Sequence, residues 1–256
     1  MNTVSRGYHL NYITEGAGPA LVLIPGLTQS IQRWVDRGYV ERFSQSFRVI
    51  ALDPLGHGRS DKPHTADAYQ MPDCALDVLA VLDSEGVSEA HVWGYSYGAR
   101  IGNTLATLHP ARVTSLIIGG QLAASVDPRI QAISDERDSK LSEALRIGDI
   151  DKALMMWGAT DPASQNVLRS DNDMTALAAA IEGDLGSKPD LDFSGLRRAP
   201  LAYAGDGEMF LGLFQHTATQ AGAEFHVIPD ANHLSAFASM TKVAPIAEEF
   251  LRRASG

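Results

Sequence analysis

The chain has 256 residues, of which 45% are hydrophobic, and it contains 23 glycines, 12 prolines and one cysteine. This composition excludes a disordered chain, a collagen-like chain and a disulfide-rich scaffold. The formal net charge of −10 disfavours nucleic acid and anionic membranes as partners. Because Cys74 stands alone and residues 1–9 lack the apolar stretch of a secretion signal, we expect a cytoplasmic protein without a disulfide or a thiolate metal cluster.

Short apolar runs recur along the chain and predict the strands of one sheet. Residues 8–13 alternate apolar and polar side chains, and a turn at residues 15–19 joins them to the uninterrupted apolar run at 20–24. This pattern predicts a hairpin that leads into a buried strand. Further runs are too short for a helix and are closed by Gly, Pro or Asp, so they predict buried parallel strands at residues 47–52, 90–93, 113–118, 201–204 and 225–228.

Segments with apolar residues at helical spacing, such as residues 75–82 and 246–251, lie between and after these strands. Strands that alternate with helices predict the α/β class, with a mostly parallel sheet covered by helices on both faces. The alternation breaks at residues 121–199, where helix-like stretches open at Asp127, Asp161 and Asp171. We therefore expect a helical insertion there, and its 14 acidic and 9 basic residues carry half of the excess negative charge.

The strongest chemical motif is Gly94-Tyr95-Ser96-Tyr97-Gly98, which follows a predicted strand and precedes the helix-compatible stretch 99–108. A strand, a sharp turn and a helix form the context of a nucleophile elbow, in which strain lifts the serine hydroxyl clear of the sheet. The two glycines are needed because side chains on either side of the turn would collide. The motif alone occurs by chance in roughly one chain in ten of this length, so its position after the strand is what makes it informative.

Four stretches in order resemble the α/β-hydrolase fold family: residues 23–27, residues 53–63, the elbow and residues 230–234. The resemblance covers nearly the whole chain except the insertion. It implies a hydrolase core formed by residues 1–120 and 200–256, with a helical cap at 121–199. We expect the glycines of residues 56–60 to form a tight turn that braces the elbow, because they lack the ending of a P-loop and the spacing of a dinucleotide-binding motif.

A serine hydroxyl needs a base and a third group that orients the base, and in this fold they follow in the order serine, acid, histidine. His233 is the one histidine after the last predicted strand, so we expect it to be the base; the other seven are expected to be surface or core residues. The family's G-x-x-D pattern places the acid at Glu208. Asp206 stays open as an alternative, because another loop conformation would present it instead.

The resemblance implies an oxyanion hole formed by the backbone N–H groups of Leu27 and Tyr97. Pro25 stands where the family often has histidine, which removes a possible bracing hydrogen bond but not the Leu27 donor. The sequence predicts no metal site and no cofactor, since it has no H-E-x-x-H motif and no cysteine pair. Candidates for substrate contact are apolar residues of the cap and of loops at strand ends, namely Met155, Met156, Trp157, Met209, Phe210 and Leu234.

These features predict a serine hydrolase that cleaves an ester or lactone of a small, uncharged or weakly polar molecule through a Ser96, His233 and Glu208 triad. The same triad also serves C–C bond hydrolases and lyases in this family, and some members bind ligands without turnover. The irregular acid loop keeps the non-enzyme alternative open. Hydrolysis of epoxides or haloalkanes by carboxylate attack is disfavoured, because that chemistry needs Asp where Ser96 stands.

Overall fold

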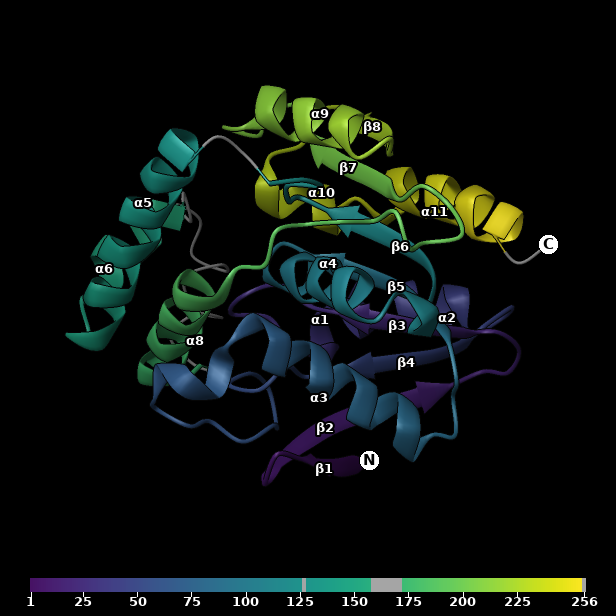
Figure 1. Ribbon diagram of the computed structural model, residues 1–256, viewed down its shortest axis with the longest axis horizontal. Coiled ribbons are helices and arrows are strands. Elements are labelled where there is room, and N and C mark those ends of the chain that lie inside the picture. Colours follow the sequence, from purple (N-terminus) through teal and green to yellow (C-terminus); the bar gives the residue numbers. More distant parts are fainter. Residues whose placement is uncertain (126–127, 158–171, 255–256) are drawn as a thin grey trace.

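The computed structural model describes residues 1–125, 128–157 and 172–254. Within them, eight strands form one sheet in the order β1-β2-β4-β3-β5-β6-β7-β8 (Figure 1). The strands are β1 (Asn2–Ser5), β2 (Tyr8–Glu15), β3 (Ala20–Ile24), β4 (Arg48–Leu52), β5 (Ala90–Tyr95), β6 (Val113–Gly119), β7 (Leu201–Gly205) and β8 (Glu224–Ile228). In the order of the sheet, all neighbouring strands from β4 to β8 are parallel. Strand β2 pairs antiparallel with β1 on one side and with β4 on the other. The predicted α/β class is confirmed.

Helices connect the strands and cover both faces of the sheet. The α-helices are α1 (Ile31–Asp36), α2 (Tyr39–Phe43), α3 (Met71–Ser84), α4 (Tyr97–Leu108), α5 (Pro128–Arg146), α6 (Ile150–Trp157), α8 (Met174–Ser187), α9 (Leu211–Gln220), α10 (His233–Ala238) and α11 (Met240–Ala254). Two 3₁₀ helices are η1 (Ala66–Tyr69) and η2 (Pro110–Arg112). None of the described helices is both long and apolar enough to span a membrane.

The core is split by the sheet into two apolar clusters because successive strand residues point to opposite faces. One cluster packs alternate residues of the strands, such as Val22 and Val92, against α3, α4 and α9. The other packs the intervening residues, such as Leu23 and Trp93, against α1, α2, α10 and α11. Burial on both faces explains why the parallel strands are uninterrupted apolar runs in the sequence.

The predicted hairpin across residues 15–19 is wrong. Strand β4 lies between β2 and β3 and pairs with both of them. The hairpin of this region instead joins β1 to β2 across Arg6 and Gly7, which both have positive φ angles. The turn at residues 15–19 carries the chain past β4 to the next position in the sheet.

Between β6 and β7 the described residues contain α5, α6 and α8, which share an apolar cluster of their own with members such as Leu141, Leu154 and Leu177. Figure 1 shows these three helices gathered at the end of the sheet toward which the parallel strands point. The predicted openings at Asp127, Asp161 and Asp171 lie outside the described residues. Helix α8 is capped by Asp173, whose carboxylate accepts from the Ala176 N–H at 3.0 Å.

The loop after β4 folds around the carboxylate of Asp53, which is 2% exposed. Its oxygens accept hydrogen bonds from the Ile31 N–H at 2.7 Å, the Arg59 N–H at 2.9 Å and the Asn11 side chain at 2.8 Å. A Cβ on Gly58 would lie 2.2 Å from this carboxylate. The glycines of the loop therefore allow its backbone to close on Asp53, and these contacts tie α1 to β2 and β4.

His57 of the same loop is fully buried and stacks on Tyr97, with ring centroids 5.6 Å apart. Burial lowers the pKa of His57 to about 4, against roughly 6.5 in an unfolded chain. Between these two values the unfolded state takes up a proton that the folded state does not. We therefore expect the free energy of unfolding to fall by about 1.4 kcal/mol per pH unit as the pH drops from 6.5 to 4, from this group alone.

Denaturant unfolding at several pH values checks this expectation. His57→Phe keeps an aromatic ring beside Tyr97 and is expected to reduce the slope in that pH window. Leu55→Ala, which removes a buried side chain without a titratable group, should lower stability equally at every pH. An unchanged slope in His57→Phe would contradict the account.

Candidate active site

Ser96 lies at the turn between β5 and α4, and its backbone is strained, with φ +52° and ψ −114°. Such an angle is uncommon for a residue with a side chain. A Cβ on Gly94 would lie 2.2 Å from the carbonyl oxygen of Gly98, and one on Gly98 would lie 2.2 Å from the carbonyl oxygen of Ile24. Both positions therefore require glycine, and the turn presents Ser96, half-buried, at the carboxyl end of the sheet.

The structure brings Ser96, His233 and Glu208 together in one hydrogen-bonded chain. The Ser96 Oγ lies 3.0 Å from His233 Nε2, and His233 Nδ1 lies 2.8 Å from Glu208 Oε2. The carboxylate accepts from Nδ1–H, which leaves Nε2 as the acceptor for the serine hydroxyl. The imidazole of His233 is about one third exposed, whereas the Glu208 side chain is only 8% exposed.

Three elements place these side chains at the same end of the sheet. Ser96 follows β5, Glu208 follows β7, and His233 is the first residue of α10. The side chain of Asn232 caps α10 by accepting from the N–H groups of Leu234 and Ser235. Because this cap fixes the start of the helix, it also sets the direction in which His233 leaves the backbone.

Asp206, the alternative acid, points elsewhere. Its carboxylate accepts from the N–H groups of Asp230 at 3.0 Å and Ala231 at 2.9 Å. These hydrogen bonds lower the pKa of Asp206. Asp206 thus ties the loop after β7 to the turn before α10, and of the two acids it is Glu208 that contacts His233.

The predicted oxyanion donors are the backbone N–H groups of Tyr97 and Leu27. Tyr97 begins α4, and its N–H is one of the four at a helix start that no helical carbonyl accepts. Leu27 follows Gly26, where a Cβ would lie 3.3 Å from the Cβ of Ser96. The loop that carries Leu27 is closed by the Gln29 N–H, which donates to the Gly26 carbonyl at 3.1 Å. Tyr97 is thus part of the elbow and Leu27 follows a residue that lies beside it, and the role of their N–H groups stays a prediction.

Residues 19–140 match the family model of the alpha/beta hydrolase fold. The elbow and the hydrogen-bonded residues Ser96, His233 and Glu208 lie at one end of a single eight-stranded sheet. The chain has the α/β-hydrolase fold. This chain resembles the solved structure of the enol-lactonase from Burkholderia xenovorans LB400, with a TM-score of 0.76, 20% identity and 99% of each chain covered. At that identity the likeness concerns the fold alone.

Two curated relatives are similar over less than half of this chain. Epoxide hydrolase B of Mycobacterium tuberculosis is 37% identical over 117 residues, which are 44% of this chain and 32% of the relative. The 2-hydroxymuconate semialdehyde hydrolase of Pseudomonas sp. (strain CF600) is 35% identical over 124 residues, 48% of this chain and 43% of the relative. The chain thus matches less than half the length of either.

The residues predicted to contact substrate lie in different surroundings. Met156 is half-buried against the cluster formed by α5, α6 and α8, whereas Met155 and Met209 are more than three quarters exposed. Leu234, beside His233, is 37% exposed. Trp157 ends α6, and its side chain lies outside the described part of the structure. Their contact with substrate stays a prediction.

Two tyrosines without a predicted role hold α10 from both ends. The Tyr95 hydroxyl donates to the carbonyl oxygen of His233, and its ring packs on the imidazole with centroids 5.5 Å apart. The Tyr39 hydroxyl donates to the carbonyl oxygen of Phe237 at 2.9 Å. Tyr95 lies inside the elbow motif, so its position directly before the serine was the available signal.

Among the described residues, no group of three or more His, Cys, Asp or Glu side chains is placed to hold a metal ion. Cys74 is buried in α3, where burial raises the pKa of its thiol to about 12. Its sulfur lies 3.8 Å from the hydroxyl of Tyr97. The thiol is therefore protonated at neutral pH and packs behind the elbow.

Proposed function

We propose that this protein is a serine hydrolase that cleaves a carboxylic ester or lactone of a small, uncharged or weakly polar molecule. The observation that carries the proposal is the hydrogen-bonded chain from Ser96 through His233 to Glu208. In this arrangement the nucleophile, the base and the orienting acid each meet their partner. The proposed reaction needs no metal and no cofactor.

In the proposed acylation step, His233 Nε2 takes the hydroxyl proton as Ser96 Oγ attacks the carbonyl carbon. Glu208 holds Nδ1–H and stabilises the imidazolium that forms. The carbonyl oxygen becomes an oxyanion, which the N–H groups of Leu27 and Tyr97 stabilise. Such donors contribute roughly 3 to 4 kcal/mol each in serine hydrolases. His233 then returns the proton to the leaving alcohol as the C–O bond breaks.

In the proposed deacylation step, water replaces the alcohol. His233 takes a proton from the water as its oxygen attacks the acyl carbon, and the same two N–H groups stabilise the second oxyanion. Collapse of that intermediate breaks the bond to Ser96 Oγ, which regains its proton from His233. A lactone follows the same path, except that the alcohol stays attached to the acyl group.

We also propose that residues 121–199 act as a cap over this site. Their helices lie at the end of the sheet that carries Ser96 (Figure 1), and Leu27 packs against both the core cluster and the cluster of α5, α6 and α8. Met156, Trp157, Met209 and Leu234 are the proposed substrate contacts. Epoxide hydrolysis is not proposed in spite of the similarity to a mycobacterial epoxide hydrolase, because Ser96 stands where carboxylate attack requires Asp.

Hydrolysis of a C–C bond is the second candidate, and it is favoured by the similarity to the 2-hydroxymuconate semialdehyde hydrolase. A panel of short-chain esters, lactones and a vinylogous diketone separates the two. We expect kcat/KM to be highest for an ester or lactone. Faster cleavage of the diketone would favour the C–C hydrolase. Binding of panel members without turnover of any would indicate a ligand-binding protein.

Tyr95 is proposed as a positioning residue for His233. Tyr95→Phe keeps the ring but removes the donor to the His233 carbonyl, a loss of about 1 to 1.5 kcal/mol. We expect kcat to fall about ten-fold with little change in KM. Tyr203→Phe is the matched control, because the Tyr203 hydroxyl accepts from Trp93 Nε1 of β5 at 3.2 Å. Equal losses of kcat in both variants would contradict the proposed role.

A further inference from the structure

Gln29 holds both backbone polar groups of Gly26, the residue before Leu27. The Gln29 N–H donates to the Gly26 carbonyl oxygen at 3.1 Å, and the side-chain oxygen Oε1 of Gln29 accepts from the Gly26 N–H at 3.3 Å. The Gly26 carbonyl and the Leu27 N–H belong to one planar trans peptide unit, in which the two groups point in opposite directions. The contact that turns this carbonyl toward Gln29 therefore also sets the direction of the Leu27 N–H.

The turn that contains Leu27 combines a flexible residue with a strained one. Gly26 rotates more freely than any residue with a side chain, and glycine is favoured there because a Cβ would lie 3.3 Å from the Cβ of Ser96. Thr28 has a φ angle of +68°, as in the third position of a type II turn, where Gly or Asn is usual. A β-branched residue is strained at such an angle. Contacts with side chains must therefore hold the turn in this conformation.

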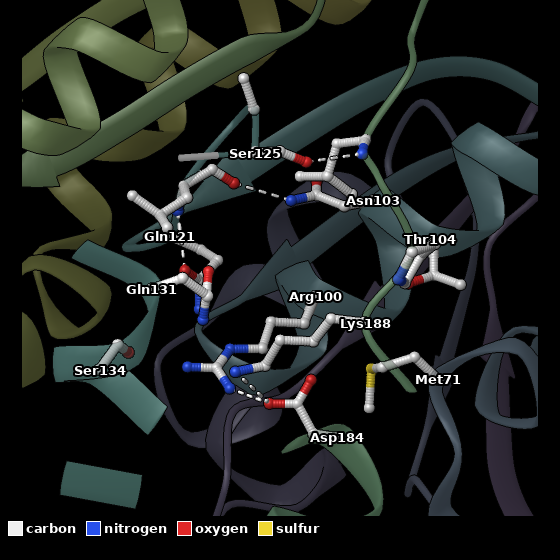
Figure 2. A pocket seen from close by; sticks show the side chains of 14 residues that line it. Met71, Arg100, Asn103, Thr104, Gln121, Ser125, Gln131, Ser134, Asp184 and Lys188 are labelled. Atoms are coloured by element: carbon white, nitrogen blue, oxygen red, sulfur yellow. Dashed lines mark hydrogen bonds and ion pairs between the residues drawn. The ribbon is translucent and has the colours of Figure 1, made fainter. Parts of the chain in front are cut away.

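The insertion anchors one side of this turn. The Thr28 carbonyl oxygen accepts from Nδ2 of Asn172, which lies just before α8, at 3.3 Å. Helix α8 is itself fixed to α4, the helix that follows Ser96, because Asp184 pairs with Arg100 (Figure 2). Asp184 is only 1% exposed, so solvent screens this ion pair little. Thr28 is thus tied to a fixed part of the fold.

On the side of Gly26, the described part of the chain offers one side-chain hydrogen bond, that of the Gln29 carboxamide. This carboxamide also lies near the nucleophile, because the Cβ position of Gly26 is 3.5 Å from Gln29 Oε1 and 3.3 Å from the Cβ of Ser96. Pro25 stands where the family often has histidine, and its side chain has no polar atom. Gln29 thus supplies a hydrogen bond to this loop that Pro25 cannot make.

We infer that Gln29 is a positioning residue for the oxyanion hole: its carboxamide oxygen holds Gly26 and thereby orients the Leu27 N–H toward the oxyanion. Gln29 acts through this backbone group and does not itself touch the reacting atoms. The inference rests on the proposed hydrolase function and adds to it the side chain on which the Leu27 donor depends. Loss of the contact should weaken stabilisation of the oxyanion and leave binding of the ester unchanged.

Two esters that differ in one atom test the inference. In 4-nitrophenyl acetate the atom that becomes the anion is oxygen, whereas in 4-nitrophenyl thionoacetate it is sulfur, which is a weak hydrogen-bond acceptor. Both esters release 4-nitrophenolate, so their kcat/KM values are measured in the same assay. The ratio of kcat/KM for the oxygen ester to that for the sulfur ester reports how much the N–H donors contribute. Because the ratio is taken within one variant, the amount of folded protein cancels.

Gln29→Met keeps nearly the same length of side chain and removes the strong acceptor. We expect kcat for the oxygen ester to fall about ten-fold, with little change in KM, and the ratio to fall at least three-fold. Gln29→Glu keeps an acceptor at the same length, and its charge acts on both anions alike, so the ratio should stay near that of the natural protein. Gln32→Met, the same replacement at an exposed position of α1, should leave both rates unchanged.

A fall in the ratio of less than three-fold in Gln29→Met would overturn the inference while leaving the hydrolase function intact. An equal fall in Gln29→Met and Gln29→Glu would also overturn it, because the loss would then not depend on the acceptor. Hydrolysis of neither ester by the folded natural protein would overturn the proposed function and this inference with it.

Discussion

Replacing Ser96 with alanine is expected to lower kcat for short-chain 4-nitrophenyl esters by a factor of roughly 10⁴ to 10⁶. The Ser96 oxygen is the atom that we expect to form the acyl-enzyme, and it lies 3.0 Å from the imidazole that we expect to take its proton. Without it, His233 and the two N–H donors remain but have no nucleophile to act on. The residual rate should resemble that left by oxyanion stabilisation and binding alone.

The fold should survive this substitution, because alanine removes only one half-buried hydroxyl and leaves the packing around it unchanged. Circular dichroism and the unfolding midpoint check that point, and Ser46→Ala, at an exposed position, serves as the control for activity. Initial rates measured at saturating ester give kcat directly. Turnover in Ser96→Ala above about one hundredth of the natural rate would argue against Ser96 as the nucleophile.

Glu208→Gln is expected to have the second-largest effect, a loss in kcat of about 10³ to 10⁴. The carboxylate accepts from His233 Nδ1–H at 2.8 Å, whereas an amide can turn its NH₂ group toward that nitrogen. This favours the tautomer with the proton on Nε2, which cannot accept from Ser96. Glu208 is not among the proposed substrate contacts, so we expect KM to change little.

Asp206→Asn provides the contrast, because both acids lie in the same loop. Asp206 accepts from two backbone N–H groups of the turn before α10, and an amide oxygen still satisfies one of them. We expect a loss in kcat of ten-fold or less and a lower unfolding midpoint. Steady-state kinetics of both variants on one ester give the comparison. A larger loss for Asp206→Asn than for Glu208→Gln would reverse the assignment of the two acids.

Much of the fold follows from local patterns. Parallel strands are buried on both faces, so the runs at residues 20–24 and 113–118 carry no polar alternation and are recognisable in isolation. Pairing is different, because it joins residues far apart in the chain. Nothing in residues 8–24 indicates that β4 inserts between β2 and β3. The prediction of a hairpin between β2 and β3 is wrong for that reason.

The candidate site likewise has parts that short motifs predict and parts that depend on contacts between distant residues. The elbow and the histidine turn are short motifs, and the structure places Ser96 and His233 within hydrogen-bond distance. The choice between Asp206 and Glu208 depends on loop conformation, and hence on a contact with residues 230–231 that sequence spacing does not reveal. Contacts between distant segments, such as that of Arg100 with Asp184 across 84 positions of sequence, are harder still to predict, because no periodicity links the two residues.

The most direct test of the central claim is covalent labelling of the natural protein with a fluorophosphonate, followed by peptide mass mapping. A fluorophosphonate reacts with a serine that an adjacent base activates. We predict one adduct per chain, on the peptide that contains Ser96, and its absence in Ser96→Ala. Adduct formation at another residue, or labelling that persists in Ser96→Ala, would contradict the claim that Ser96 is the nucleophile.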